Sequence, residues 1–260
     1  MMRRVLLILS LVGVIVFAAI VATVEYERRD NAFRVKRAQE IVRELQRLEI
    51  GKSDLSVADA IVRKFGNAPL PWGWTRYPKN YCASPERDEN CVYLLSMNNS
   101  PLENLLEKHP LLRRLGFHEW DGRAVILFNG GTVSHHDFIV WYRTSRGDLR
   151  GFGASEGQSL PKYEPDQARI SDSYSVMRFH TGHTSPEYGL GLQATLTASA
   201  SATERQRASH IDFACLAQKE GCDDVCKVMP EAWRDFYEVR GRFDVEKRGP
   251  DYFLCTESPK

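Results

Sequence analysis

The sequence predicts an α+β fold, in the order N-terminal transmembrane helix, helical pair, mostly antiparallel sheet, C-terminal helices. Three observations predict it. An uncharged apolar run, Val5–Val24, comes near the start; helical periodicity follows over residues 33–65; and strand-like segments then follow one another until helical patterns return after residue 203. Strands that follow one another, with helices grouped at the ends, indicate α+β rather than alternating βαβ units.

The composition is that of an ordinary globular chain. The 260 residues include 35 Lys and Arg and 34 Asp and Glu, for a formal net charge of +1, and 43% of them are hydrophobic. These values exclude wholesale disorder, collagen and coiled-coil fibres. A dedicated nucleic-acid-binding protein normally shows a basic excess, so we expect no nucleic-acid partner.

The apolar run Val5–Val24 is long enough to cross a membrane, because twenty helical residues extend about 30 Å. It follows the short basic head Met1–Arg4 and is either an uncleaved signal anchor or a signal peptide removed near Ala18-Ala19 or Ala22. The run is long for a signal peptide and lacks a clean A-x-A site, which favours the anchor. We therefore expect the membrane to be a partner through residues 5–24.

The charged residues on the two sides of the span favour opposite orientations in the membrane. More basic residues follow the span than precede it, which favours a cytosolic body; they are Arg28, Arg29, Arg34, Lys36 and Arg37. The acidic flank at Glu25 and Glu27, the export-like head and an even number of cysteines beyond the span favour export. We expect a single-pass cell-membrane protein with an extracytoplasmic body, so that any signal would pass through a membrane partner.

The predicted organisation has three parts: residues 1–24 as the signal anchor, 25–50 as a juxtamembrane helix and 51–260 as a single α+β domain. Apolar residues recur at spacings of three and four from Val35 to Leu48, so this helix can continue the membrane helix outward as a stalk. A short amphipathic helix cannot bury its apolar stripe alone, so we expect this helix and the next one to pack on each other or on a sheet. Gly51 ends it, Ser53 or Ser56 caps the next helix, and Gly66 stops that helix.

The clearest β-hairpin joins residues 124–128 to 133–144 through the turn Asn129-Gly130-Gly131. The remaining segments are assigned by the same patterns. Strands are expected at 91–97, 149–154, 174–180 and 191–198, loops at 67–90 and 156–172, and helices at 101–115, 203–219 and 230–239.

Short stretches carry a resemblance. The run Leu45–Ser53, the helix end Lys64-Phe65-Gly66 and the segment from Cys215 to Gly221-Cys222 resemble uncharacterised single-span exported bacterial proteins of unknown function. The helix–Gly–helix stretch is also loosely similar to small envelope assembly lipoproteins, although the lipobox cysteine is missing near the start. The resemblance implies a cell-envelope location and no particular chemistry.

The cysteines predict disulfide bonds. They are Cys82, Cys91, Cys215, Cys222, Cys226 and Cys255. Six cysteines allow 15 pairings, but Cys82 and Cys91 flank one polar loop and form the natural first pair. The other four would then pair among themselves and tie the C-terminal tail to the helical region. A zinc site from His210, Cys215, Cys222 and Cys226 is the alternative, but it lacks a C-x-x-C knuckle, and an exported setting favours disulfides.

One motif suggests catalysis. Residues Gly153–Gly157 match G-x-S-x-G, in which a strand–turn–helix bend exposes a nucleophilic serine. Asp166 or Asp172 and then His180 or His183 follow in the order of the serine hydrolases, so the candidate set is Ser155, Asp172 and His183. Pro161 and the absence of βα alternation favour a plain turn instead.

Three further patterns favour structural roles. His135, His136, His180 and His183 could bind a metal ion from two strands, but adjacent strand residues point to opposite faces. Gly51-Lys52-Ser53 lacks the remaining glycine of a phosphate loop and follows a helix. The aromatic residues Trp72, Trp74, Tyr77 and Tyr81 could bind a glycan or a partner protein, or cover an edge of the core.

These observations predict a membrane-anchored envelope protein that acts as a non-enzymatic binding or interaction module, without a cofactor or metal. Its expected partner is another envelope protein or a surface polymer. The alternative function is an exported serine hydrolase that uses Ser155.

Overall fold

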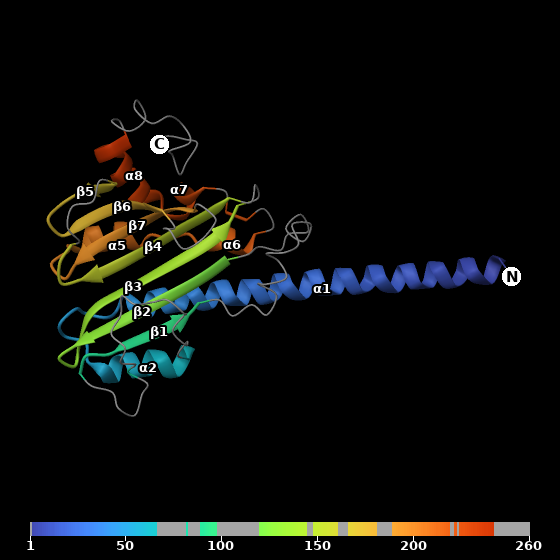
Figure 1. Ribbon diagram of the computed structural model, residues 1–260, viewed down its shortest axis with the longest axis horizontal. Helices are drawn as coiled ribbons and strands as arrows, with labels where there is room; N and C mark the ends of the chain where they lie inside the picture. Colours follow the sequence, from blue (N-terminus) through green and yellow to red (C-terminus); the bar gives the residue numbers. More distant parts are fainter. Residues whose placement is uncertain are drawn as a thin grey trace.

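The computed structural model describes residues 2–66, 82, 89–97, 120–144, 148–160, 166–180, 189–218, 221–222 and 224–241. It has a long N-terminal helix, one mostly antiparallel seven-stranded sheet and short C-terminal helices, which confirms the predicted α+β class. Figure 1 shows the N-terminal half of the long helix protruding from a body built on the sheet. The predicted helix at 101–115 and most of the predicted loop at 67–90 lie outside the described residues.

Helix α1 (Met2–Leu45) runs without a break from the apolar segment into the body. Its first part is exposed, with Leu9, Phe17 and Val21 being 63%, 69% and 51% accessible. It is long and apolar enough to cross a membrane. From Glu27 onward one face is buried, and Val35 to Leu45 belong to the main hydrophobic core. The stalk expected from the sequence is therefore also a core element.

The buried Asn31 docks α1 to the body just beyond the apolar segment, whereas the buried Arg34 has its ion-pair partners on α1 itself. The amide of Asn31 accepts a hydrogen bond from Trp120 Nε1 at 2.7 Å and donates one to the carbonyl of Leu216 at 2.7 Å. Arg34 pairs with Asp30 at 2.8 Å. Because both partners of Asn31 belong to other elements, the helix has a defined rotation about its axis where it enters the body.

Helix α2 (Leu55–Phe65) is capped by Asp54 rather than by Ser53 or Ser56, because the Asp54 carboxylate accepts the backbone N–H groups of Ser56 and Val57. Gly66 ends it with φ 78°, as the sequence predicts. The turn between α1 and α2 is bound to the β2–β3 hairpin, since Gly51 N donates to the Val133 carbonyl and Val133 N to the Ser53 carbonyl.

The strands form one sheet in the order β1-β2-β3-β4-β7-β6-β5. Their bounds are Val92–Ser96, Trp120–Asn129, Thr132–Arg143, Leu149–Gly157, Gln167–Arg169, Tyr174–His180 and Gly189–Thr197. Two antiparallel meanders, β1 to β4 and β5 to β7, are joined by the parallel pair β4–β7. The β2–β3 turn uses Gly130 and Gly131 at φ 59° and 77°, as a two-residue hairpin requires.

The sheet extends further than the sequence predicts. The plain turn expected at Gly153–Gly157 is wrong, because β4 continues through Gly157 and pairs with β3 and β7 on both sides. The loop expected at 156–172 also contains β5. Ladder hydrogen bonds to two neighbouring strands outweigh the low strand propensity of the glycines in this segment.

The C-terminal helices are shorter than predicted. The helix expected at 203–219 is two helices, α5 (Ala202–Ser209) and α6 (Ala214–Ala217). Asp212, between them, accepts the N–H of Ala214 at 2.8 Å. Helix α7 (Val225–Val228), helix α8 (Pro230–Phe236) and the π-helix η1 (Tyr237–Gly241) follow. A Ser201–Glu204 capping box begins α5, and hydrogen bonds from Ser171 and Ser201 lower the pKa of Glu204 to about 2.

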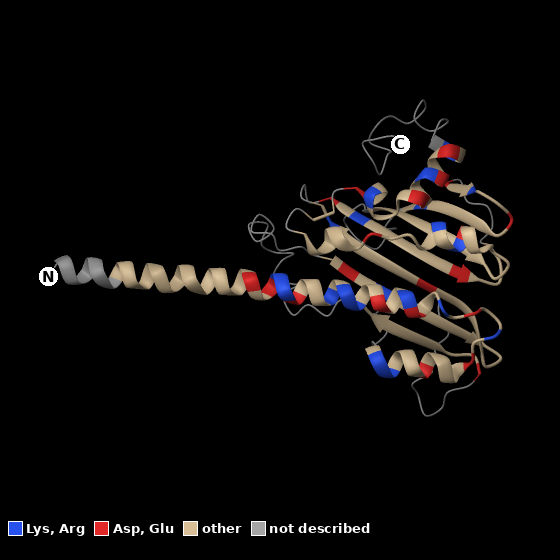
Figure 2. Ribbon diagram, turned by 180° about the vertical axis from the view of Figure 1, so that it is seen from behind, with Lys and Arg blue, Asp and Glu red and all other residues tan. Residues whose placement is uncertain are grey.

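The two faces of the sheet differ. In Figure 2 the helices α1 and α2 lie over the near face of the sheet, where inward residues such as Phe138, Phe152 and Leu192 are buried. On the opposite face glycines make room for rings, since a Cβ on Gly151 would lie 2.5 Å from Trp141, and one on Gly191 2.3 Å from Phe179. These two rings pack edge to face with centroids 5.1 Å apart.

Two disulfides join described residues. Cys82 bonds Cys91, as predicted from the loop they flank, and Cys215 bonds Cys222. Cys226 is also disulfide-bonded, and the predicted pairing of Cys255 lies outside the described residues. The Cys215–Cys222 bond removes two thiolates from the alternative zinc site.

Candidate functional site

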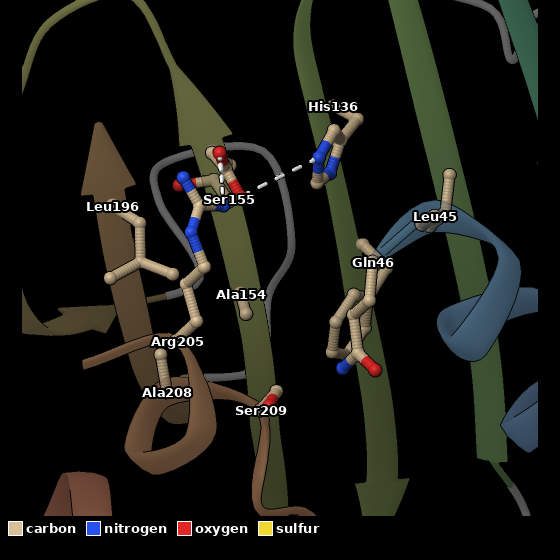
Figure 3. Close-up of a pocket in the computed structure, with 11 residues that line it drawn as sticks. Leu45, Gln46, His136, Ala154, Ser155, Leu196, Arg205, Ala208 and Ser209 are labelled. Carbon is tan, nitrogen blue, oxygen red and sulfur yellow. Dashed lines mark hydrogen bonds and ion pairs between the residues drawn. The ribbon is translucent and has the colours of Figure 1, made fainter. Parts of the chain in front are cut away.

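A cavity of about 70 Å³ lies between the end of α1 and helix α5, above strands β3, β4 and β7 (Figure 3). Its walls are largely apolar, and polar groups gather at one end and at the rim. The lining residues are Leu45, Gln46, His136, Phe138, Ala154, Ser155, Glu156, Leu196, Arg205, Ala208 and Ser209. An apolar lining with a few convergent polar groups is typical of small-ligand sites, although this cavity is smaller than most of them.

Strand register creates the polar end of the cavity. His136 and Glu156 are direct partners across the β3–β4 ladder, so their side chains leave the same face of the sheet. Phe138 and Ala154 form the next inward pair, and the small side chain of Ala154 leaves space above the strand. The hollow therefore arises because a small residue stands where most inward positions of this sheet carry a large one.

His136 is buried and only partly satisfied. Its side chain is 8% exposed, and its Nε2 has no hydrogen-bond partner among the described residues, although Glu156 Oε2 lies 3.8 Å away. The imidazole also hydrogen-bonds the backbone of Leu48, just after α1. Because Nε2 is unpartnered, we assign this bond to the Nδ1–H. Burial, reinforced by His135 and Arg205, lowers the pKa of His136 to about 3, so the ring is neutral at physiological pH.

Arg205 balances the charge of Glu156. The carboxylate of Glu156 is 6% exposed and accepts both of its short contacts from Arg205 Nη1. The other guanidinium nitrogens of Arg205 bond backbone carbonyls before α5, with Nη2 3.0 Å from the Ala198 oxygen and Nε 3.2 Å from the Ala200 oxygen. Arg205 therefore holds the β7–α5 connection while it neutralises the buried carboxylate.

The predicted catalytic residues lie in different places. Ser155 is in the middle of β4, and its hydroxyl donates to Thr195 Oγ1 at 3.2 Å. Its side chain leaves the face opposite to Glu156, because neighbouring strand residues alternate. Asp172 is fully exposed in a turn and pairs with Arg169. His183 lies outside the described residues, so the triad stays a prediction, but Ser155 is not on a strand–turn–helix bend.

The histidine pair and the Gly51-Lys52-Ser53 motif have structural contacts among the described residues. His135 contacts Asp137 at 3.2 Å on the face away from His136, so the adjacent histidines do point apart. Among the described residues there is no cluster of three or more His, Cys, Asp or Glu arranged to hold a metal ion. Lys52 pairs with Glu49 in the turn after α1. The aromatic residues Trp72, Trp74, Tyr77 and Tyr81 lie outside the described residues.

Sequence reasoning missed Glu156 and Arg205 as site residues, and it considered His136 only as a possible metal ligand beside His135. A signal was present for His136, which takes an inward position in the alternation His136, Phe138, Val140, Tyr142. A histidine at an inward position of a strand is buried, and a buried polar side chain either has a hydrogen-bond partner or serves a function. No comparable signal marks Arg205, since only the tertiary fold brings α5 to β4.

Comparison with known protein families, with curated proteins and with solved structures finds no match. The site must therefore be interpreted from its own chemistry.

Proposed function

We propose that this protein is a membrane-anchored recognition module of the cell envelope, whose cavity between α1 and α5 binds part of a partner molecule. One observation carries the proposal. The helix that provides the apolar segment also provides a wall of the cavity, through Leu45 and the adjacent Gln46. The apolar segment and one wall of the cavity thus belong to one continuous stretch of chain.

Two observations support a membrane anchor with an exported body: the exposed apolar side chains of α1 and the disulfide bonds. Apolar side chains from Leu9 to Val21 are uncovered by the body, and such a surface is stable in lipid rather than in water. Disulfides are typical of oxidising compartments outside the cytosol. Together they favour a retained span with the body outside the cytosol.

The position of the cavity supports a partner that lies away from the membrane. Leu45 ends α1 at the end of the body opposite to the protruding segment (Figure 1). The helix rises about 1.5 Å per residue, so Leu45 lies about 30 Å beyond Val24. A rigid helix of this length would hold the cavity at a fixed height above the bilayer, facing the envelope.

Site-specific photo-crosslinking in native membranes tests the proposal. A photoreactive amino acid replaces Gln46, which is exposed at the cavity, or Phe33, which is 67% exposed on α1 about 20 Å closer to the membrane. We expect a discrete crosslinked product from position 46 that is absent from position 33. No product at position 46, or the same products at both positions, would contradict a recognition role for the cavity.

A further inference from the structure

The polar end of the cavity presents two hydrogen-bond acceptors to each other. With Nδ1–H bound to the Leu48 backbone, the neutral His136 ring has only a lone pair at Nε2. That lone pair faces the Glu156 carboxylate at 3.8 Å, and both residues are more than nine-tenths buried. Two acceptors without a donor between them repel, and a buried polar atom without a partner destabilises the folded state.

A donor placed beside this pair would satisfy both acceptors. A single nitrogen or oxygen atom off the line joining them can lie about 2.9 Å from each, which is ordinary hydrogen-bond distance. The group needs two hydrogens, or one hydrogen shared between the acceptors. Beyond it the cavity is walled by Phe138, Ala154 and Leu196, so the rest of the ligand must be apolar and short.

The charge of the ligand is constrained as well. A carboxylate would place a third acceptor and a second negative charge against Glu156. An ammonium group would add an unbalanced positive charge, because Arg205 already neutralises Glu156, and burying an uncompensated charge is expensive. A neutral donor avoids both penalties.

We propose that the cavity binds a neutral hydrogen-bond donor, a primary amide or hydroxyl, carried on a short apolar stem. The donor bridges His136 Nε2 and Glu156 Oε2, while the stem packs between Phe138 and Leu196. The inference rests on the proposed function, since such a group would be the part of the partner that enters the cavity.

Three probes of nearly equal size test the class of ligand: propionamide, propionate and propylammonium. Each is titrated at pH 7.5 into the full chain in detergent micelles, and the imidazole nitrogens of His136 are followed by ¹⁵N NMR. We expect only propionamide to shift the His136 Nε2 resonance saturably, with Kd on the order of millimolar for so small a ligand. Equal or tighter binding of either charged probe, or a cavity that holds water only and binds none, would overturn the proposal.

Matched variants locate the binding. Ser209→Leu places a larger side chain at the cavity, whereas Gln206→Leu alters an exposed position on the same helix that does not line it. We expect Ser209→Leu to weaken propionamide binding at least 10-fold and Gln206→Leu to leave it unchanged. The two inferences fail separately: a crosslink at position 46 without propionamide binding refutes only the ligand class, and propionamide binding without a crosslink refutes only the recognition role.

Discussion

At the scale of the residue, the site depends on a histidine that stays neutral inside the protein. Glu156 and Arg205 face His136 from β4 and α5, and His135 lies beside it on β3. Burial is the largest cause of its low pKa, which means that folding opposes protonation of this ring. The protonated form is correspondingly more stable in the unfolded chain.

This difference predicts a pH dependence of stability. The pKa of His136 is about 3 in the folded protein and 6.5 for the free side chain, so the unfolded state binds the extra proton between these values. The stability contributed by the neutral His136 ring is fully present above pH 6.5. It is lost as the pH falls toward 3, and the free energy of unfolding falls by at most about 1.4 kcal/mol per pH unit. Urea unfolding of the full chain in detergent, from pH 8 to pH 4, should show a shallower fall in the free energy of unfolding for His136→Gln than for the wild type.

The exposed His210 serves as the control. The free energy of unfolding of His210→Gln should fall with pH as steeply as that of the wild type. A fall as shallow as that of His136→Gln would contradict the assignment.

Asn31 gives a second prediction, which concerns docking of α1. Asn31→Ala removes the amide that accepts from the Trp120 indole N–H and donates to the Leu216 carbonyl. We expect a loss of about 2–6 kcal/mol in the free energy of unfolding, because each of the two lost buried hydrogen bonds costs about 1–3 kcal/mol. The exposed Lys36→Ala on the same helix should change it by no more than about 0.5 kcal/mol. Equal unfolding midpoints for the two variants would show that Asn31 does not secure the helix.

At the scale of the element, helix and strand patterns follow from local sequence where a clear signal exists. The glycine pair of the β2–β3 turn and the stop at Gly66 were predictable, because each needs a positive φ. The strand through Ser155 was not, because its hydrogen bonds come from β3 and β7, which are distant in sequence. For the same reason the pairing of Glu156 with Arg205 could not be predicted.

The cap of α2 is a testable feature of a single element. Asp54→Ala removes the acceptor for the N–H groups of Ser56 and Val57, and we expect a loss of about 1 kcal/mol, the usual cost of deleting such a cap. Asp54→Asn keeps an oxygen acceptor and should restore most of that loss. Chemical denaturation measures both variants, and an Asp54→Ala protein as stable as the wild type would refute the role of the cap.

At the scale of the whole molecule, the account depends on one continuous helix that anchors the body and reaches the cavity. The sequence predicted the apolar span, the α+β class and the Cys82–Cys91 disulfide, each from local composition or spacing. It also predicted that the apolar stripe of residues 33–48 packs against other elements, and Val35 to Leu45 do lie in the core. It did not predict that the same helix reaches the cavity, because the cavity is formed by elements that are distant in sequence.

The most direct test is thiol alkylation followed by peptide mass mapping of protein extracted from native membranes, without any reductant. The account predicts that the N-terminal peptide containing Leu9–Val21 is retained and that Cys82, Cys91, Cys215, Cys222 and Cys226 carry no alkyl group. Alkylated cysteines, or a soluble protein that has lost its N-terminal peptide, would contradict an anchored body outside the reducing cytosol.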